Sequence, residues 1–363
     1  MSTNIPVRLK NNPYNITVGS GILGQLPKFI RHLGLGKDVV IITHVRLERL
    51  HWGKLAAGLK KAGYSVKTFT VPEGEPSKSA ACAMKLLTQI SAYDVDKKIF
   101  IAALGGGVVG DLAGFVAAIY KRGVPYIQVP TTLLAQIDSA IGGKTAIDLP
   151  TGKNLVGAFY QPRLVLADAQ VLKTLDLRQI RNGLAEAIKY GIIRDAGLFN
   201  FISSNHQKLL KGDTASLNTV VRRCAAIKAQ VVSMDEKETK GLRTILNFGH
   251  TVGHAVEAAA RYDQYHHGEA VGLGMRVAAR ISVLLGFLKT SEEKRINALI
   301  SAVGLPERIK GVALAKIMNL MQHDKKFFAG HNRFVLALKI GQVAVVRDIP
   351  ADIITESIKL YLD

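Results

Sequence analysis

The chain has 363 residues, of which 48% are hydrophobic and 21% charged, so it can bury a large core and has an ordinary globular composition. It contains no apolar run long enough to span a bilayer, and residues 1–10 lack the basic-then-apolar pattern of a signal peptide, which predicts a cytoplasmic protein without a membrane partner. The length favours two domains. The two cysteines, Cys82 and Cys224, do not form a disulfide framework, so any metal site must use histidines and carboxylates.

The formal net charge of +20 is consistent with nucleic acid, an anionic surface or an anionic small molecule as a partner. The basic residues are spread along the chain in runs no longer than a pair such as Arg222-Arg223, and no basic motif is interleaved with aromatic residues. This pattern argues against nucleic acid. We interpret the charge as a solvated basic surface with some residues directed at an anionic substrate.

The first half of the chain alternates strand patterns with helical patterns. Residues 39–43 form a continuous apolar run, as a buried parallel strand would, and the helical stretch 47–62 that follows ends at Gly63. Such alternation predicts a doubly wound α/β domain. Further strands are expected at 14–18, 65–71, 98–104, 126–129 and 164–166, and a further helix at 79–93.

A glycine-rich turn joins the strand at 98–104 to a helix expected up to Tyr120. Gly105, Gly107 and Gly110 fit the pattern G-x-G-x-x-G, in which backbone amides at a helix N-terminus approach a phosphate. The pattern alone is weak, because tight strand–helix turns also require glycine, and a purely structural turn is the alternative. No strand ending in an acidic residue follows at the usual distance, so the ribose contacts of a dinucleotide would come from elsewhere.

Polar and glycine residues interrupt the otherwise apolar segment 130–145, in which Asp138 and Lys144 flank a glycine pair. A surface loop with solvated charges is one interpretation. A second polar cluster, Lys153 and Asn154, follows closely and favours an anion pocket.

From about Val171 the sequence becomes helix-rich, and we place a domain boundary between residues 172 and 173. Glu186 and Lys189 are three positions apart amid apolar neighbours, so they share one helix face. They are either an exposed ion pair or a metal-binding carboxylate beside a substrate-facing amine, and spacing alone does not decide between these alternatives.

Three histidines around residue 250 suggest a metal site. His250 and His254 are four apart and share a face of the helix expected over 250–260, and His267 follows one short loop later. Zinc favours nitrogen and carboxylate ligands, and a catalytic site usually takes three of them and leaves one position open. A core or surface role for the histidine pair is the alternative, and these residues leave open which carboxylate would join them.

Read in chain order, the motifs of this sequence resemble those of the 3-dehydroquinate synthase family, within the sugar-phosphate cyclase superfamily. The resemblance covers nearly the whole chain. Its motifs are the glycine turn, Pro130-Thr131-Thr132, Gly142-Gly143-Lys144-Thr145, Gly152-Lys153-Asn154, Glu186-Ala187-Ile188-Lys189-Tyr190-Gly191 and Asn247-Phe248-Gly249-His250.

The resemblance implies an α/β N-terminal Rossmann-like domain over residues 1–172, which binds NAD, and an all-α C-terminal domain over residues 173–363, which binds one divalent metal, zinc or cobalt. It also implies a homodimer. The implied NAD contacts are Glu73, Gly74, Glu75, Pro76, Ser77, Lys78, Gly106, Gly107, Val108, Val109, Gly110, Asp111, Thr131, Thr132, Lys144, Lys153, Val171, Leu172, Lys173 and Thr174.

The metal ligands implied by the resemblance are Glu186, His250 and His267, which leaves His254 to face the substrate. Arg122 matches an arginine that reaches the site of the neighbouring subunit. The implied substrate-pocket residues are Asp138, Lys144, Asn154, Lys189, Lys228, Arg243, Asn247, His254 and Lys325.

The reaction implied by the resemblance converts 3-deoxy-D-arabino-heptulosonate 7-phosphate, a phosphorylated sugar acid, to 3-dehydroquinate and phosphate in the shikimate route to aromatic amino acids. A hydroxyl is oxidised, phosphate leaves by β-elimination, the ketone is reduced again, and the ring closes by an aldol step. NAD is therefore a catalyst and not a consumed substrate. The metal would polarise the substrate hydroxyl, and the lysines and Arg243 suit two anionic groups.

Two alternatives remain within related enzymes: another sugar-phosphate cyclase and a metal-dependent polyol dehydrogenase, which would release NADH stoichiometrically. The carboxylate-binding pair Lys228 and Arg243 favours 3-dehydroquinate synthase. The sequence departs from the family pattern at two places. At His44, many relatives have an aspartate that contacts the ribose of the cofactor. At residues 146–149, Ala-Ile-Asp-Leu replaces a more usual Gly-Val-Asn-His.

Overall fold

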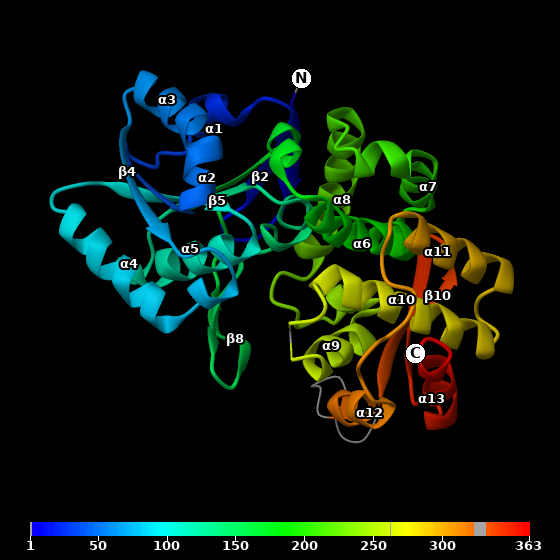
Figure 1. The fold of residues 1–363 in the computed structure, drawn as a ribbon. Helices are drawn as coiled ribbons and strands as arrows, with labels where there is room; N and C mark the ends of the chain where they lie inside the picture. The colour runs from blue at the N-terminus through cyan, green and yellow to red at the C-terminus, as the bar shows by residue number, and fades with distance from the viewer. Residues whose placement is uncertain (1, 262, 323–331) are drawn as a thin grey trace. The chain divides into compact units, whose positions relative to one another are not determined.

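The structure is a computed structural model that describes residues 2–261, 263–322 and 332–363. The chain forms two compact units (Figure 1). The first comprises Met1–Asp176 and Gly212–Lys237, and the second comprises Leu177–Lys211 and Glu238–Asp363. Among the described residues, no helix combines the length and the apolar character that a membrane crossing requires.

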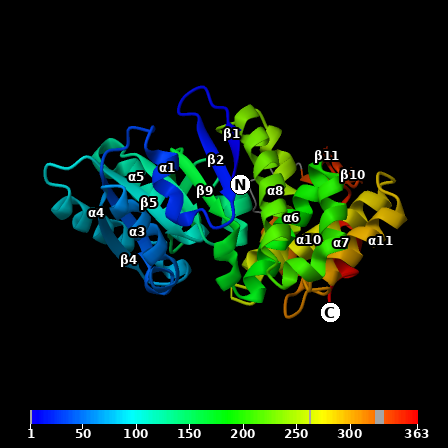
Figure 2. The same cartoon turned by 90° about the horizontal axis from the view of Figure 1, so that it is seen from above.

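The first unit is built on a seven-stranded sheet, which Figure 2 shows from above. In order across the sheet, its strands are β1 (Thr3–Val7), β2 (Tyr14–Gly19), β9 (Leu164–Asp168), β6 (Tyr126–Pro130), β5 (Ile99–Gly105), β3 (Asp38–His44) and β4 (Ser65–Val71). Neighbouring strands run parallel except β1 and β2. Every residue of β5 is buried, which explains its continuous apolar sequence.

Helices cover both faces of this sheet. They are α1 (Leu26–Ile30), α2 (Val45–Leu47), α3 (Gly53–Lys61), α4 (Ala80–Tyr93) and α5 (Gly107–Ile119). α4 and α5 share a core with Ile99 and Ile101 of β5, whereas Phe100 between them is equally buried on the opposite face. α1 and α3 lie across the sheet from α4 and α5 (Figure 1). The helix expected over 47–62 is interrupted by the π-helical segment Glu48–Trp52.

Several elements of the first unit were not predicted, among them β1, α1 and the elements of the segment 135–159. The segment after the Gly142-Gly143 pair forms an antiparallel hairpin of β7 (Lys144–Leu149) and β8 (Gly152–Phe159), and Ala135–Ser139 just before it is π-helical. The strand alternation here is masked in the sequence by glycines and polar residues, and π-helical turns have no simple sequence pattern.

α8 (Thr214–Met234) also belongs to the first unit, although it follows two helices of the second unit in the chain. It packs against β1 and β2. The predicted boundary between residues 172 and 173 assigned this helix to the C-terminal domain, because a sequence alone does not show which sheet edge a late helix returns to.

The second unit is largely helical. Its elements are α6 (Leu177–Arg194), α7 (Ala196–Leu210), α9 (His250–Ala259), α10 (His267–Leu284), α11 (Thr290–Ala302), α12 (Leu314–Gln322), α13 (Ala351–Lys359) and an antiparallel hairpin of β10 (Arg333–Lys339) and β11 (Gln342–Arg347). The predicted fold class, an α/β domain followed by a helical region, is confirmed, but the second unit is not all-α because it carries the β10–β11 hairpin.

Glycines bring α9 and α10 unusually close together. A Cβ atom on Gly274 of α10 would lie 1.9 Å from the carbonyl oxygen of Gly249, and one on Gly253 of α9 would lie 3.0 Å from that of Ala270. Gly249 caps α9 with a φ of +80°, a conformation that glycine adopts without strain. This backbone contact fixes the separation of the two helix starts, each of which begins with a histidine.

Candidate active site

Glu186 and Lys189 lie on α6 and form an ion pair in the interior of the second unit. The Glu186 residue is 0% exposed and Lys189 only 2% exposed. The alternative of an exposed surface pair is therefore wrong for these residues. A carboxylate and an ammonium are buried only where further polar groups stabilise them. This part of α6 is therefore a candidate functional site and not an ordinary packing surface.

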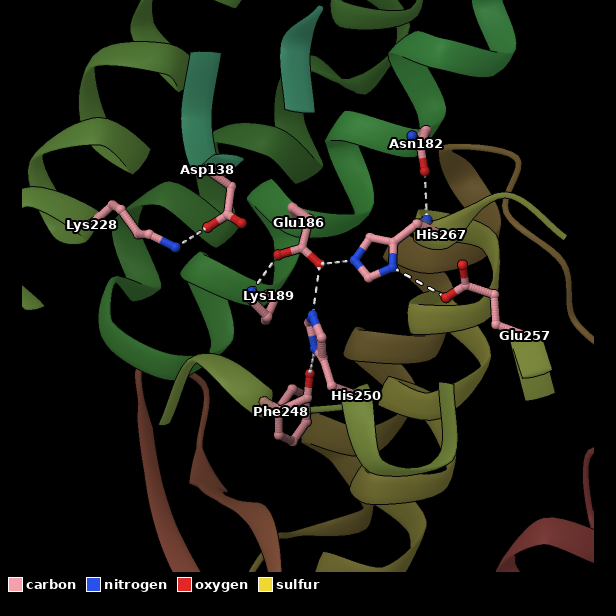
Figure 3. Close-up of polar contacts among 10 residues, drawn as sticks. Asp138, Asn182, Glu186, Lys189, Lys228, Phe248, His250, Glu257 and His267 are labelled. Carbon is pink, nitrogen blue, oxygen red and sulfur yellow. Dashed lines mark hydrogen bonds and ion pairs between the residues drawn. The ribbon is translucent and has the colours of Figure 1, made fainter. Parts of the chain in front are cut away.

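His250 begins α9 and points its Nε2 atom at Glu186, with 3.3 Å between Nε2 and Oε1 (Figure 3). Its Nδ1 atom lies 3.2 Å from the carbonyl oxygen of Phe248. A carbonyl only accepts hydrogen bonds, so Nδ1 carries the proton and the lone pair of Nε2 faces the carboxylate.

His267 begins α10 and approaches the same carboxylate from another side. Its Nε2 atom is 3.5 Å from Oε1 of Glu186, and its Nδ1 atom is 3.3 Å from Oε2 of Glu257 (Figure 3). The backbone next to it is anchored by Asn182 of α6, whose Oδ1 accepts a 2.5 Å hydrogen bond from the Gly268 amide. This hydrogen bond fixes the backbone at the start of α10, whatever the orientation of the His267 side chain.

Burial and neighbouring charges give the two imidazoles different protonation. Burial, helped by the Lys189 ammonium, lowers the pKa of His250 well below its ordinary value. Burial also acts to lower the pKa of His267, but hydrogen bonds with Glu186 and Glu257 outweigh it and raise the pKa to about 10. A cation that binds Nε2 of His267 must displace this proton, because a ligating imidazole is neutral.

The residues fit a divalent metal. One ligand atom from each of Glu186, His250 and His267 can be chosen so that all lie within 4.8 Å of one another. Two imidazole nitrogens and a carboxylate are a donor set that zinc favours. A lone pair of neutral His250 facing a carboxylate is repulsive by itself, and a cation between them would remove that repulsion.

His254 does not join this group. It is exposed, and its ring lies edge-on to His250 with 5.1 Å between the ring centroids. Together with Glu257 and His267 it forms a second set of possible ligands. His250 and His254 share one helix face, but of these two residues only His250 directs a nitrogen at Glu186.

The first unit contains a second charged pair, formed by Asp138 and Lys228. Asp138 lies on the π-helical segment that precedes the hairpin, and its Oδ1 is 2.6 Å from Nζ of Lys228 on α8. α8 packs directly against this π-helical segment. The insertion of α8 into the first unit is what brings these two residues together.

The glycine turn carries a third polar cluster, also in the first unit. Lys78 forms an ion pair with Asp111 on α5, 2.6 Å apart, and a hydrogen bond with Asn154 on β8. Lys153 lies 3.7 Å from Glu75. Burial is the main reason that the pKa of Asp111 is raised to about 6, although Lys78 acts against it. Residues predicted from three separate motifs therefore meet at the start of α5.

The glycines of this turn are required by close packing. A Cβ atom on Gly105 would lie 2.4 Å from Cβ of Val109, and one on Gly106 would lie 3.0 Å from Cγ2 of Thr132. The structural-turn interpretation of the motif therefore holds whether or not a phosphate binds there.

The remaining predicted residues are dispersed over several elements. Thr131 is buried after β6, and residues 171–174 lie in a short 3₁₀ segment. Arg243 is buried beside Glu238, with 3.1 Å between Nε and Oε1. It lies in another 3₁₀ segment, Leu242–Asn247, which Asn247 ends. Lys144 and Arg122 are exposed at the start of β7 and in the turn after α5. Lys325 lies outside the described residues.

Three polar residues at the site were not predicted: Glu238 and Glu257, which contact Arg243 and His267, and Asn182, which binds the backbone next to His267. Glu257 had a detectable signal, because it lies seven positions after His250 and therefore on the same helix face. Asn182 and Glu238 had no such signal: Asn182 is 86 residues from Gly268 in the sequence, and Glu238 precedes Arg243 by five residues outside any regular helix spacing.

Solved structures share this fold over almost the whole chain. 2-Epi-5-epi-valiolone synthase from Streptomyces hygroscopicus, with NAD+ and Zn2+ bound, is 27% identical with a TM-score of 0.88, over 97% of this chain and 98% of that one. 2-Deoxy-scyllo-inosose synthase, in complex with carbaglucose-6-phosphate, NAD+ and Co2+, is 26% identical with a TM-score of 0.89, over 99% and 100%. Glycerol dehydrogenase from Schizosaccharomyces pombe, at 16% identity and a TM-score of 0.68, shares the fold alone. The architecture is thus that of the sugar-phosphate cyclases.

Sequence comparison shows to which family of the sugar-phosphate cyclases the chain belongs. Family models described as 3-dehydroquinate synthase N-terminal and C-terminal match residues 68–182 and 183–327. 3-Dehydroquinate synthase from Desulforamulus reducens is 46% identical over 96% of this chain and 98% of its own length, and that from Pelotomaculum thermopropionicum is 47% identical over 97% and 95%. The chain belongs to the 3-dehydroquinate synthase family, so it is an enzyme and the resemblance seen in the sequence is confirmed.

Proposed function

We propose that the chain converts 3-deoxy-D-arabino-heptulosonate 7-phosphate to 3-dehydroquinate and phosphate, as a cytoplasmic enzyme of the shikimate pathway. Membership of the family supports this activity. The observation that carries it within the structure is the group of Glu186, Lys189 and His250, which are buried, and His267, which is partly exposed; together they combine a metal-type donor set with an amine.

Glu186, His250 and His267 would hold one divalent metal, zinc or cobalt. When bound there, the metal would polarise a substrate hydroxyl and lower its pKa. Lys189 lies beside these ligands, so its amine is placed to exchange a proton with that hydroxyl. His254, which is exposed and adjacent, would bind an anionic group or transfer a proton.

NAD would be held in the first unit by the cluster at the glycine turn and by the threonines after β6. Bound there, it would supply a transient oxidation of the substrate that is reversed within the same turnover. Lys78 orders this cluster, because it joins Asp111 of the turn to Asn154 of the hairpin. The amides at the start of α5 suit a phosphate group.

Lys228 and Arg243 are the basic side chains that we propose for binding the anionic groups of the substrate. In the first unit, Lys228 is held by Asp138, and in the second, Arg243 is held by Glu238. Each cation is therefore pre-oriented by a carboxylate before it binds. A guanidinium can grip a carboxylate through two parallel hydrogen bonds, which suits Arg243 to the acid group.

A homodimer is supported by the surface of the β7–β8 hairpin. Leu149, Leu155, Val156 and Phe159 are large hydrophobic residues that are exposed on it, and Ile119 at the end of α5 is exposed as well. Apolar side chains gathered on one element mark a contact surface. The exposed Arg122, which follows α5, would then reach the partner subunit's site.

The direct test is release of phosphate from the heptulosonate phosphate, with NAD in catalytic amount and zinc or cobalt added. Phosphate should be released over many turnovers per NAD without accumulation of NADH. One NADH per product would indicate a polyol dehydrogenase instead.

Another sugar-phosphate cyclase activity is the second candidate, because the valiolone and inosose synthases share the fold closely. Assays with their non-acidic sugar phosphates distinguish the two. A preference for the sugar acid that is lost in Arg243→Met would support the 3-dehydroquinate synthase activity, and equal turnover of non-acidic substrates would contradict it.

A further inference from the structure

Glu257 is a largely buried carboxylate with no role in the scheme above. It lies on α9, two turns after His250, and its side chain is only 12% exposed. Its Oε2 atom is 3.3 Å from Nδ1 of His267 on α10 (Figure 3). A buried carboxylate requires a partner of this kind, and here that partner is a proposed metal ligand.

The two histidines have the same arrangement of their ring nitrogens. In both, Nε2 faces Glu186 and Nδ1 faces an acceptor. For His250 the acceptor is a neutral backbone carbonyl, whereas for His267 it is the carboxylate of Glu257. A hydrogen bond at one ring nitrogen fixes the tautomer and the ring orientation that the other nitrogen presents to a metal.

Hydrogen bonds hold the backbone around His267, so what remains to be fixed is the orientation of its imidazole ring. Asn182 binds the Gly268 amide, and Glu269 accepts from the His266 amide in a capping box. A Cβ atom on Gly268 would lie 2.3 Å from the Asn182 carbonyl oxygen, which shows how tightly this turn is packed. Rotation of the imidazole about its side-chain bonds is restricted from the Nδ1 side by Glu257.

We propose that Glu257 is a positioning residue for His267. Its carboxylate accepts the Nδ1–H hydrogen bond, holds the Nε2 lone pair toward Glu186 and His250, and makes His267 a more basic ligand than a carbonyl partner would. This inference rests on the proposed metal site at Glu186, His250 and His267. Its consequence is a metal affinity that depends on a residue outside the ligand set.

The test measures zinc affinity and not turnover. Metal-free wild type, Glu257→Ala and Glu257→Gln are titrated with zinc in competition with a chromophoric chelator. Glu257→Ala should bind zinc ~10–100-fold more weakly, which is the usual effect of losing such an outer hydrogen bond. Glu257→Gln should recover part of this loss, because its amide oxygen still accepts from Nδ1–H. The same order should appear in the visible absorption of the cobalt-loaded proteins, which reports ligand geometry.

Glu356→Gln is the matched control, since it removes one negative charge from the second unit at an exposed glutamate that pairs with Arg280. It should leave the zinc dissociation constant unchanged. Wild-type affinity in Glu257→Ala, or the same loss in Glu356→Gln, would overturn the proposal. If Glu257→Ala does not fold, a wild-type dissociation constant in Glu257→Gln overturns it equally.

Two further results separate this proposal from the one it rests on. Glu186→Gln should lose zinc more severely than either Glu257 variant, and unchanged affinity there would refute the metal site itself. If the second possible ligand set, His254, Glu257 and His267, held a zinc ion in addition to the first, two ions would bind per chain. A measured stoichiometry of two would make Glu257 a ligand and refute its positioning role.

Discussion

The buried carboxylate of Glu186 interacts with three polar side chains of the candidate site. Its carboxylate pairs with Lys189 on its own helix and faces the imidazoles of His250 and His267 from two other helices. Because the group is enclosed, each of these interactions is stronger than it would be in water. The same enclosure makes the loss of any one partner costly for the others.

The first residue-scale prediction concerns the ligands themselves. Glu186→Gln and His250→Ala should each abolish metal-dependent turnover, because each removes one of three ligands. Zinc content after dialysis and turnover with added zinc measure the effect. Activity that persists in chelator-treated mutant protein would contradict the ligand assignment.

The second residue-scale prediction concerns Asp111. Its pKa is raised to about 6 from an ordinary value of 3.8, chiefly by burial, so the folded state binds its proton more tightly than the unfolded state does. This contribution to stability is fully present below about pH 4 and is lost as the pH rises through 6; it amounts to ~3 kcal/mol at most.

Asp111→Asn should therefore flatten the dependence of the urea unfolding midpoint on pH between 4 and 7. The exposed Asp96, whose φ of +57° an asparagine tolerates, provides the matched control Asp96→Asn, which should keep the wild-type slope. An unchanged slope in Asp111→Asn would contradict the raised pKa of this carboxyl.

At the scale of elements, the site depends on the close approach of α9 and α10. Helices normally pack with their axes ~8–10 Å apart, and bare glycine surfaces permit the shorter distances. Here Gly249, Gly253 and Gly274 let the backbones touch, so the two histidines at the helix starts face one carboxylate.

Gly274→Ala should destabilise the protein by at least ~2 kcal/mol, because the new methyl group would lie 1.9 Å from a backbone oxygen that cannot move aside. Zinc affinity should fall with it, since the helices must separate. Gly53→Ala is the control: no atom lies within 4 Å of its Cβ position, and alanine is the better helix former, so it should be neutral or stabilising by up to ~1 kcal/mol. Equal stability of the two variants, measured by urea unfolding, would refute the packing argument.

At the scale of the whole molecule, the proposed homodimer can be tested through the β7–β8 hairpin. Phe159 is 46% exposed and Leu155 is 53% exposed on this element, where a second chain would cover them. Phe159→Glu combined with Leu155→Glu should shift the protein from dimer to monomer in sedimentation velocity experiments, because two charges would be buried at the contact.

Met84→Glu is the matched control for this prediction, because Met84 is 61% exposed on α4 of the same unit and is not part of the hairpin. It should leave the oligomeric state unchanged. A wild-type protein that sediments as a monomer would remove the basis of the dimer proposal.

The sequence alone predicted the order of the main strands of the α/β half and the donor types of a candidate metal site. Continuous apolar runs predicted β3 and β5 nearly to the residue, because strands buried on both faces require apolar residues at nearly every position. β4 was also predicted at its observed bounds, although most of its residues are not buried. The motif residues Glu186, His250 and His267 were identified through the family pattern, and the donor types alone indicated a metal.

Only the tertiary structure decided which residues meet. The close packing of α9 and α10, the return of α8 to the first unit beside Asp138, and the contact of Glu257 with His267 all join residues that are distant in the chain or differently placed on a helix. Local patterns report the period of burial along one element. They carry no information about the distance between two elements, which is set by the side chains, or the glycines, where they touch.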